Sequence, residues 1–133
     1  LQLAGMTIYV NKMPMGHVMG QIMPDTTGPL AVALVYDGLC TFEFGVVAEV
    51  FGLDRPEMGP GWYRFASCGI EDGPLRAHGG LAITPDHGPD LIEEADIIVV
   101  PGWRGADHPV PEALCAALCR AGSTATGPGR LPP

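Results

Sequence analysis

Hydrophobic positions along this sequence form alternating strand-like runs and helix-like stripes. Residues 30–36 and 96–100 hold continuous apolar runs, which are typical of strands buried on both faces of a parallel sheet. Between them, residues 41–51 have apolar side chains at helical spacing, and Thr41 and Gly52 are suitable to cap and to end a helix. The expected inward stripe of this helix is Phe42, Val46, Val47, Val50 and Phe51.

Weaker patterns complete the predicted secondary structure. Three further elements are expected: a strand over 62–68, a hairpin over 75–84 and one or two helical turns over 89–95. Pro111 is suited to open a second helix, with Gly122 beyond its end. The expected apolar face of that helix is Ala113, Leu114, Ala117 and Leu118. This alternation of strands and helices predicts the α/β class.

The elements predict one partial domain over residues 30–120. Residues 1–29 hold five of the six methionines and are interpreted as a disordered or leader segment, with at most a short strand over 6–10. Residues 121–133 lack periodicity and are expected to form a disordered tail. Since a parallel sheet needs another strand at this point, we expect a sheet that is incomplete at its C-terminal side. The strand at 96–100 would then be an apolar edge that favours aggregation.

The charge pattern excludes several classes of partner. The chain has a formal net charge of −8 at pH 7, and such a surface repels phosphate, so direct nucleic-acid contact is not expected. No apolar run approaches membrane-spanning length and no signal-peptide pattern is visible, which predicts a cytoplasmic protein without a membrane partner. The four cysteines are interpreted as reduced, mostly buried structural thiols: Cys40, Cys68, Cys115 and Cys119.

Glu43 is the first candidate for a functional residue. It lies on the inward stripe of the first helix, where a carboxylate is costly to bury without partners. It also lies near the carboxyl end of a strand, where open α/β sheets bind ligands. A glutamate in the first turn is equally explained by the helix dipole, so both interpretations stay open.

A second candidate group follows the strand at 96–100 directly. Gly102 permits close backbone approach, free amides there would hold an anion or oxyanion, and Arg104 would pair with a carboxylate. The alternative is a tight turn covered by Trp103. No nucleophile with an adjacent base is visible, the four histidines lack metal-ligand spacing, and no cofactor is expected. A methionine-rich stretch over 13–23 would suit Cu(I), although a leader without a selected role is favoured.

Several strings in the sequence carry a family resemblance. In chain order they are V-Y-D-G-L-C-T-F-E-F-G, A-E-V-F-G, G-P-L-R-A-H-G-G-L, A-D-I-I-V-V-P-G-W-R and P-V-P-E-A-L. Together they resemble the ThiJ/PfpI family, which has the class I glutamine-amidotransferase-like fold, and most of all the amino-terminal domains of AraC-type transcriptional regulators. The resemblance implies part of a flavodoxin-like, doubly wound parallel sheet. Glu43 matches the family's acidic position, and Gly102 matches a glycine that lines the same pocket.

The resemblance also implies a function. The family's cysteine comes on the next strand, in a Ser-x-Cys-x-Gly-like turn that has no counterpart here, and the AraC-type DNA-binding helices would lie further on. We therefore expect a truncated ligand-sensing domain without catalysis or DNA binding, which binds an unknown small molecule at Glu43, Gly102, Trp103 and Arg104. Homo-oligomer formation stays open. The alternatives are a small ThiJ/PfpI-type enzyme or remnant acting on a carbonyl, amide or isocyanide compound, or an interaction module that uses the methionine-rich arm.

Overall fold

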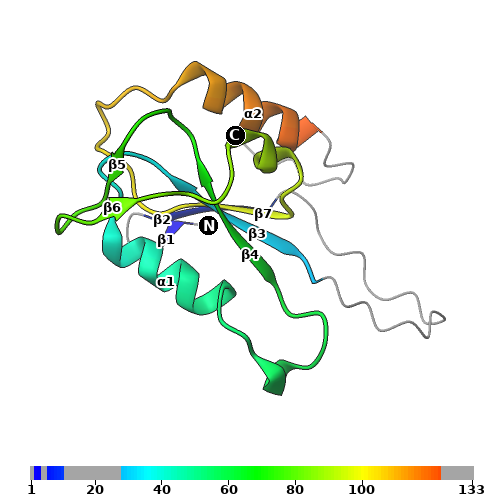
Figure 1. The fold of residues 1–133 in the computed structure, drawn as a ribbon. Helices are drawn as coiled ribbons and strands as arrows, with labels where there is room; N and C mark the ends of the chain where they lie inside the picture. Colours follow the sequence, from blue (N-terminus) through cyan, green and yellow to red (C-terminus); the bar gives the residue numbers. More distant parts are fainter. Residues whose placement is uncertain (1, 4–5, 11–27, 124–133) are drawn as a thin grey trace.

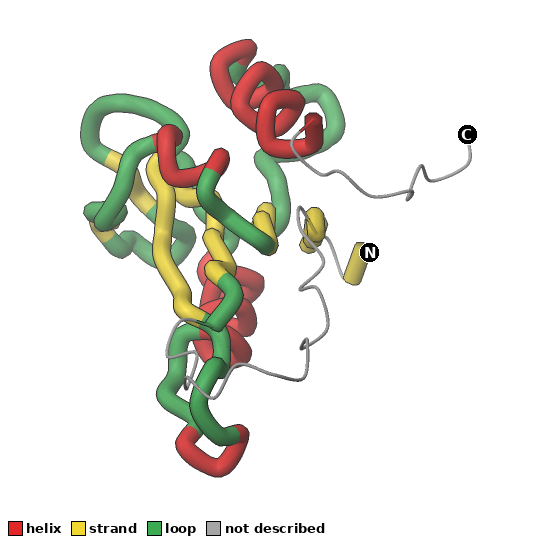
Figure 2. Tube along the Cα trace, turned by 90° about the vertical axis from the view of Figure 1, so that its right-hand side faces the viewer, coloured by secondary structure: helices red, strands yellow, loops and turns green. Residues whose placement is uncertain are grey.

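The computed structural model describes residues 2–3, 6–10 and 28–123 and shows a mixed five-stranded sheet between two helices (Figures 1 and 2). The predicted α/β class is confirmed. The strands of this sheet are β1 (Gln2–Leu3), β2 (Met6–Val10), β3 (Leu30–Val35), β4 (Arg64–Gly69) and β7 (Ile97–Val100). The other elements are the helices α1 (Thr41–Phe51) and α2 (Glu112–Ser123), the β5–β6 hairpin (Leu75–Arg76 and Ala82–Ile83), and the 3-10 turns η1 (Pro56–Met58) and η2 (Pro89–Glu93).

The strand order in the main sheet is β1-β2-β7-β3-β4. Strand β3 pairs in parallel with both β4 and β7, while β2 pairs antiparallel with β7 and with β1. All six residues of β3 are buried, as its continuous apolar run predicts for a strand covered on both faces. The elements predicted over 30–36, 41–51, 62–68, 75–84, 89–95 and 96–100 are all present, with bounds that differ by at most two residues at the strand and helix ends.

The two helices cover opposite faces of the sheet (Figures 1 and 2). Alternate residues of a strand point to opposite faces, and the core divides accordingly. Val32, Leu34 and Ile98 share a cluster with Leu114 and Ala117 of α2. A second cluster unites Ala33 of β3 and Val99 of β7 with Val47 of α1. The sheet is therefore the middle layer of a three-layer sandwich.

Helix α1 is rotated relative to the prediction. Of the expected stripe only Val47 is buried, whereas Phe42, Val46 and Val50 are 77%, 37% and 44% exposed. Phe51 packs against the core as expected, and Phe44, which was not part of the expected stripe, does so too. The Phe44 ring centroid lies 6.3 Å from that of Phe65. The apolar residues of α1 surround most of the helix, so the pattern alone did not determine which side faces the sheet.

Gly52 ends α1 as predicted, but the start of α1 and the end of α2 differ from the prediction. Cys40 is the N-cap of α1, and the Thr41 hydroxyl donates a hydrogen bond to the His78 carbonyl at 2.7 Å instead of capping the helix. In α2, Leu114 and Ala117 are buried as expected, but Ala113 is exposed. Gly122 lies inside the last turn of α2, so residues 121–123 are helical and do not belong to a disordered tail.

Strand β2 corrects two expectations about the N-terminal segment. The strand at 96–100 was expected to be an exposed apolar edge, but Met6–Val10 pairs along it from Thr7↔Val100 to Val10↔Ile97. The interpretation of residues 1–29 as disordered therefore does not hold for β2, whose weak strand pattern is confirmed. Residues 11–27, with the methionine-rich stretch, lie outside the described residues, as do 124–133. Neither described helix has the length and apolar character needed to cross a bilayer.

Candidate functional site

The site candidates meet where β3 and β7 end. These two strands are parallel neighbours, paired from Ala31↔Ile97 to Ala33↔Val99, so their carboxyl ends lie at the same sheet edge. From this edge β3 continues to α1 on one face, and β7 continues to α2 on the other (Figure 1). Divergence of two neighbouring connections to opposite faces defines a topological switch point, the usual ligand-binding position in open α/β sheets.

A buried tyrosine joins the two strand ends. The Tyr36 hydroxyl, one residue past β3, donates a 2.6 Å hydrogen bond to the Pro101 carbonyl, one residue past β7. Its ring centroid lies 5.0 Å from that of Trp103. Burial raises the pKa of the Tyr36 phenol far above its ordinary value, and the neighbouring Cys40 and Glu43 add to this effect. Tyr36 is thus a neutral hydrogen-bond donor that fixes the distance between the loops after β3 and β7.

Gly102 lets the loop after β7 approach the start of α1 closely. Its φ of +67° is in the left-handed region that favours glycine. A Cβ at this position would lie 2.7 Å from the Cys40 sulfur and 3.7 Å from the Tyr36 hydroxyl oxygen. The half-buried Cys40 thiol therefore belongs to the site, although sequence reasoning set it aside as structural. The sequence feature that could have identified Cys40 as a site residue is its position between the end of β3 and the first turn of α1.

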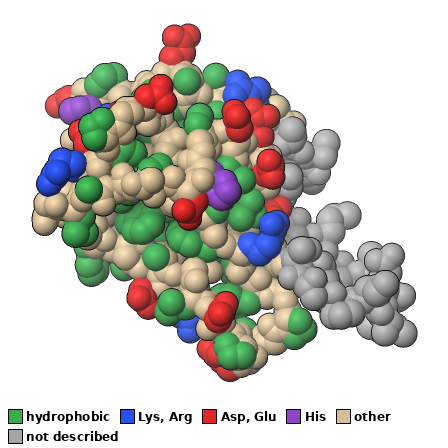
Figure 3. Space-filling view, viewed as in Figure 1, with side chains coloured by type: hydrophobic (Ala, Val, Ile, Leu, Met, Phe, Trp, Pro, Cys, Tyr) green, Lys and Arg blue, Asp and Glu red, His purple; other side chains and the backbone are tan. Residues whose placement is uncertain are grey.

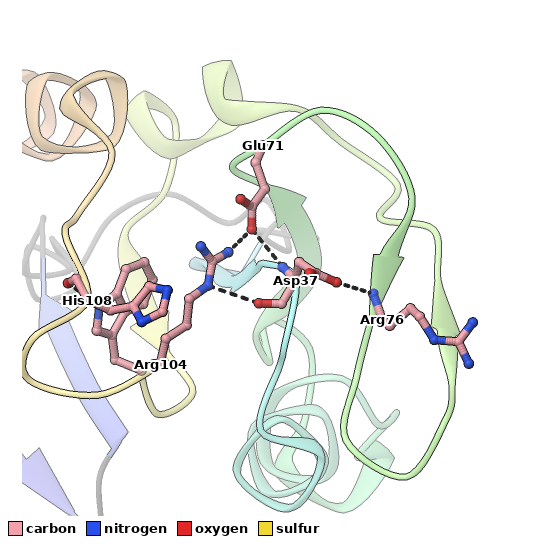
Figure 4. Close-up of polar contacts among 6 residues, drawn as sticks. Asp37, Glu71, Arg76, Arg104 and His108 are labelled. Atoms are coloured by element: carbon pink, nitrogen blue, oxygen red, sulfur yellow. Dashed lines mark hydrogen bonds and ion pairs between the residues drawn. The ribbon is translucent and has the colours of Figure 1, made fainter.

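Arg104 is held by three sets of contacts, of which Figure 4 shows the hydrogen bond to Asp37 and the ion pair with Glu71. Its Nε donates to the Asp37 carbonyl at 2.9 Å, and its Nη2 forms an ion pair with Glu71. Its guanidinium carbon lies 5.3 Å from the ring centroids of both Tyr36 and Trp103. The expected carboxylate partner of Arg104 is therefore present inside the protein. Sequence reasoning missed Glu71, although it lies two residues past the end of β4 and so belongs to the same sheet edge.

Further hydrogen bonds tie the loops around Arg104 together. One Glu71 carboxylate oxygen accepts from the Asp37 amide at 2.7 Å, and the Asp37 carboxylate accepts from the Arg76 amide at 2.9 Å (Figure 4). The indole of Trp103 donates to the His108 carbonyl at 3.2 Å. Trp103 thus covers the turn, as the structural alternative suggested, while also lining the sheet edge.

Glu43 lies in the first turn of α1, half-buried and close enough to Tyr36 to act on it electrostatically. Among the described residues its carboxylate has no hydrogen-bond partner, in contrast to that of Glu71. The structure therefore brings all four predicted candidates, Glu43, Gly102, Trp103 and Arg104, to one edge of the sheet. Of the three carboxylates there, Glu71 is engaged by Arg104, Asp37 accepts from the Arg76 amide, and Glu43 is available.

The remaining cysteines take no part in these contacts. Cys68 is buried, its thiol donates to the Gly88 carbonyl at 3.0 Å, and burial raises its pKa to about 11. Cys115 and Cys119 are free thiols exposed on α2, which corrects the expectation that most thiols are buried. Within the described segments, no group of three or more His, Cys, Asp or Glu side chains is placed to hold a metal ion.

Comparison with known proteins supplies no relative. The sequence matches no protein-family model, and no curated protein or solved structure matches it either.

Proposed function

We propose that this chain is the ligand-sensing domain of an AraC-type transcriptional regulator, and that it acts by binding a small molecule without catalysis or DNA contact of its own. The fold we propose is part of a flavodoxin-like, doubly wound sheet. Among the parallel strands, β3 comes first in the chain, β4 second and β7 third. Across the sheet they lie in the order β4, β3, β7, which is second, first, third. This is the beginning of the flavodoxin-like order, in which the ligand lies between the first and third strands.

The observation that carries the proposal is the collection of aromatic and polar groups at that switch point. Trp103 supplies ring surface and packs against the buried Tyr36, and the Gly102 backbone approaches α1 closely. A few polar groups that converge beside aromatic surface are typical of small-molecule sites. The pairing of β3 with β7 brings the segments that carry these groups to one edge of the sheet.

The contacts also indicate which groups would touch a ligand. Arg104 and the Tyr36 hydroxyl are already engaged by Glu71 and by the Pro101 carbonyl, so they act as a frame. The Glu43 carboxylate is the acceptor without a hydrogen-bond partner in the described part of the chain. We therefore assign Glu43 as the main polar contact, and the ligand as a small molecule with a hydrogen-bond donor or a positive charge.

Thermal-shift screening of the purified chain against small amines, amides and amino acids tests this function. A compound that stabilises the wild-type protein should lose its effect in Glu43→Gln. It should keep its effect in Glu49→Gln, a matched change on the exposed side of the same helix. Ligands that stabilise Glu43→Gln as well as the wild type would show that the site lies elsewhere. Binding of the isolated chain to duplex DNA at moderate salt would contradict the absence of DNA contact.

One observation favours the enzymatic alternative, a ThiJ/PfpI-type activity on a carbonyl, amide or isocyanide compound. The Cys40 thiol, a side chain that can act as a nucleophile, lies beside Gly102 and at the N-terminus of α1. Turnover of such a compound that is abolished in Cys40→Ser but kept in Cys115→Ser would establish catalysis and replace the sensing proposal.

A further inference from the structure

We propose that the outer face of α1 is a docking surface for a basic amphipathic helix of a partner protein. This inference goes beyond the proposed sensing function, because it concerns the side of α1 that faces away from the sheet; Glu43, the proposed ligand contact, lies where that side borders the site. We call it the outer α1 face and define it by Phe42, Val46 and Val50, with Glu43 and Glu49 at its borders.

The outer α1 face is apolar and uncovered. Phe42, Val46 and Val50 follow one another at intervals of four residues, so they form one stripe along the helix. They are 77%, 37% and 44% exposed, and Leu53 and Met58 beyond the helix are 47% and 58% exposed. Figure 3 shows hydrophobic side chains at the surface over the position of α1. Contiguous exposed apolar side chains with a polar rim are typical of protein interaction sites.

The charges at its borders indicate what kind of partner fits. With 3.6 residues per turn, Glu43 lies on one side of the stripe and Glu49 on the other. Helix α1 contains no lysine or arginine. Arg55, beyond the helix, donates to the Glu49 backbone carbonyl at 3.0 Å and lies 3.7 Å from Glu57, so its charge is already countered. The apolar stripe thus has acidic borders.

Acidic borders decide between the candidate occupants. Two copies of this chain packed through α1 would bring glutamates against glutamates, which is unfavourable, and the net charge of −8 adds to the repulsion. An anionic membrane surface is disfavoured for the same reason. A helix with apolar residues at i, i+4 and i+7 and flanking Lys or Arg satisfies both the stripe and its borders.

The test is a titration of the purified full chain with a fluorescent helical peptide that has leucines at i, i+4 and i+7, flanking lysines and alanines elsewhere. Phe42→Ser and Val46→Ser should each weaken binding roughly tenfold, as expected for loss of a central apolar contact. Glu49→Lys should weaken binding and reduce its salt dependence. The matched control is Leu81→Ser, which removes a leucine that is 55% exposed in the β5–β6 hairpin and should leave the affinity unchanged.

Three outcomes would overturn the proposal. The first is equal peptide affinity of wild type and Phe42→Ser, with circular dichroism showing that both are folded. The second is a concentration-dependent dimer in analytical ultracentrifugation that Phe42→Ser abolishes, which would assign the face to a second copy. The third is binding to phosphatidylcholine vesicles that the same substitution abolishes, which would assign it to lipid. Since Phe42 is largely exposed, its replacement leaves the core intact.

Discussion

Arg104 and Glu71 form an ion pair that crosses the end of β3, joining the loop after β7 to the loop after β4. The same Glu71 oxygen accepts from the Asp37 amide at the end of β3 (Figure 4). Three neighbouring strands are therefore connected at their carboxyl ends by one carboxylate. The pair comes from segments far apart in sequence, and its side chains are only 17% and 28% exposed.

We expect this pair to contribute more to stability than an exposed one. A double-mutant cycle with Arg104→Met and Glu71→Gln should give a coupling free energy of about 1 kcal/mol or more in urea denaturation, because partly buried, charge-assisted hydrogen bonds are stronger than solvated ones. The Arg120–Glu93 pair serves as the comparison, with side chains 58% and 48% exposed. Its coupling should stay below about 0.5 kcal/mol. Equal coupling in the two cycles would contradict the role assigned to Arg104.

Replacement of Gly102 tests the close approach of the site loop to α1. Gly102→Ala should lower the free energy of unfolding by about 2–4 kcal/mol, since it combines left-handed backbone strain with a contact between the new Cβ and the Cys40 sulfur. Gly38 also has a positive φ, but a Cβ there would have nothing within 4 Å.

The comparison separates the two causes. Gly38→Ala should lower the free energy of unfolding by only about 1–2 kcal/mol, because it introduces backbone strain without a steric contact. Cys40→Ala, which removes the sulfur, should recover part of the loss in the Gly102→Ala background. If Gly102→Ala lowers the free energy of unfolding by no more than Gly38→Ala does in chemical denaturation, the close packing of Gly102 against Cys40 is refuted.

The buried Cys68 thiol predicts a loss of stability in alkaline solution. Burial raises the pKa of this thiol from 9.0 to about 11. Below pH 9.0 the thiol is neutral in both states and its contribution is fully present. Above that pH the unfolded chain loses the proton while the folded one retains it, so the free energy of unfolding falls by up to about 1.4 kcal/mol per pH unit until the folded thiol also ionises.

Urea denaturation at several values between about pH 8 and about pH 10 measures this slope. The slope should become shallower in Cys68→Ala and remain unchanged in Cys115→Ala, whose thiol is exposed. The raised pKa of the Tyr36 phenol adds a second decline at still higher pH, which both variants should retain. A slope that does not change in Cys68→Ala would refute the burial of this thiol.

Strand β2 is expected to protect β7 from aggregation. Ile8 packs with the cluster around Ala33 and Val99, so Ile8→Asp should release β2 from β7 and cost about 2–3 kcal/mol. The exposed edge of β7 should then produce aggregation on heating and faster amide exchange in β7, measured by light scattering and hydrogen exchange. Tyr9→Thr changes the next residue, which is 48% exposed, and should have little effect on either measurement.

Local sequence patterns were sufficient to predict the strands β3, β4 and β7 and the helix α1. Each of these elements depends on interactions within a short segment: a continuous apolar run, a helical period, or a Gly or Pro at its end. The patterns also led to Glu43 and to the Gly102–Arg104 turn, because both directly follow predicted strands and parallel strands end at a common edge.

Local patterns could not predict which side of α1 faces the sheet. Phe42, Phe44, Val46 and Val50 are all apolar, and the choice between them depended on contacts with Phe65 of β4, a residue from another element. The ion pair between Arg104 and Glu71 could not be predicted from local patterns either, since it requires the ends of β4 and β7 to lie on either side of β3.

The sequence by itself determined which segments become strands and helices and which residues stand at the strand ends. Only the tertiary structure decided that an N-terminal strand, β2, covers the edge of β7, and that Cys40, Glu71 and Tyr36 join the site. The physical reason is that strand pairing, side-chain packing and ion pairs between distant segments depend on spatial proximity, which no local period in a chain encodes.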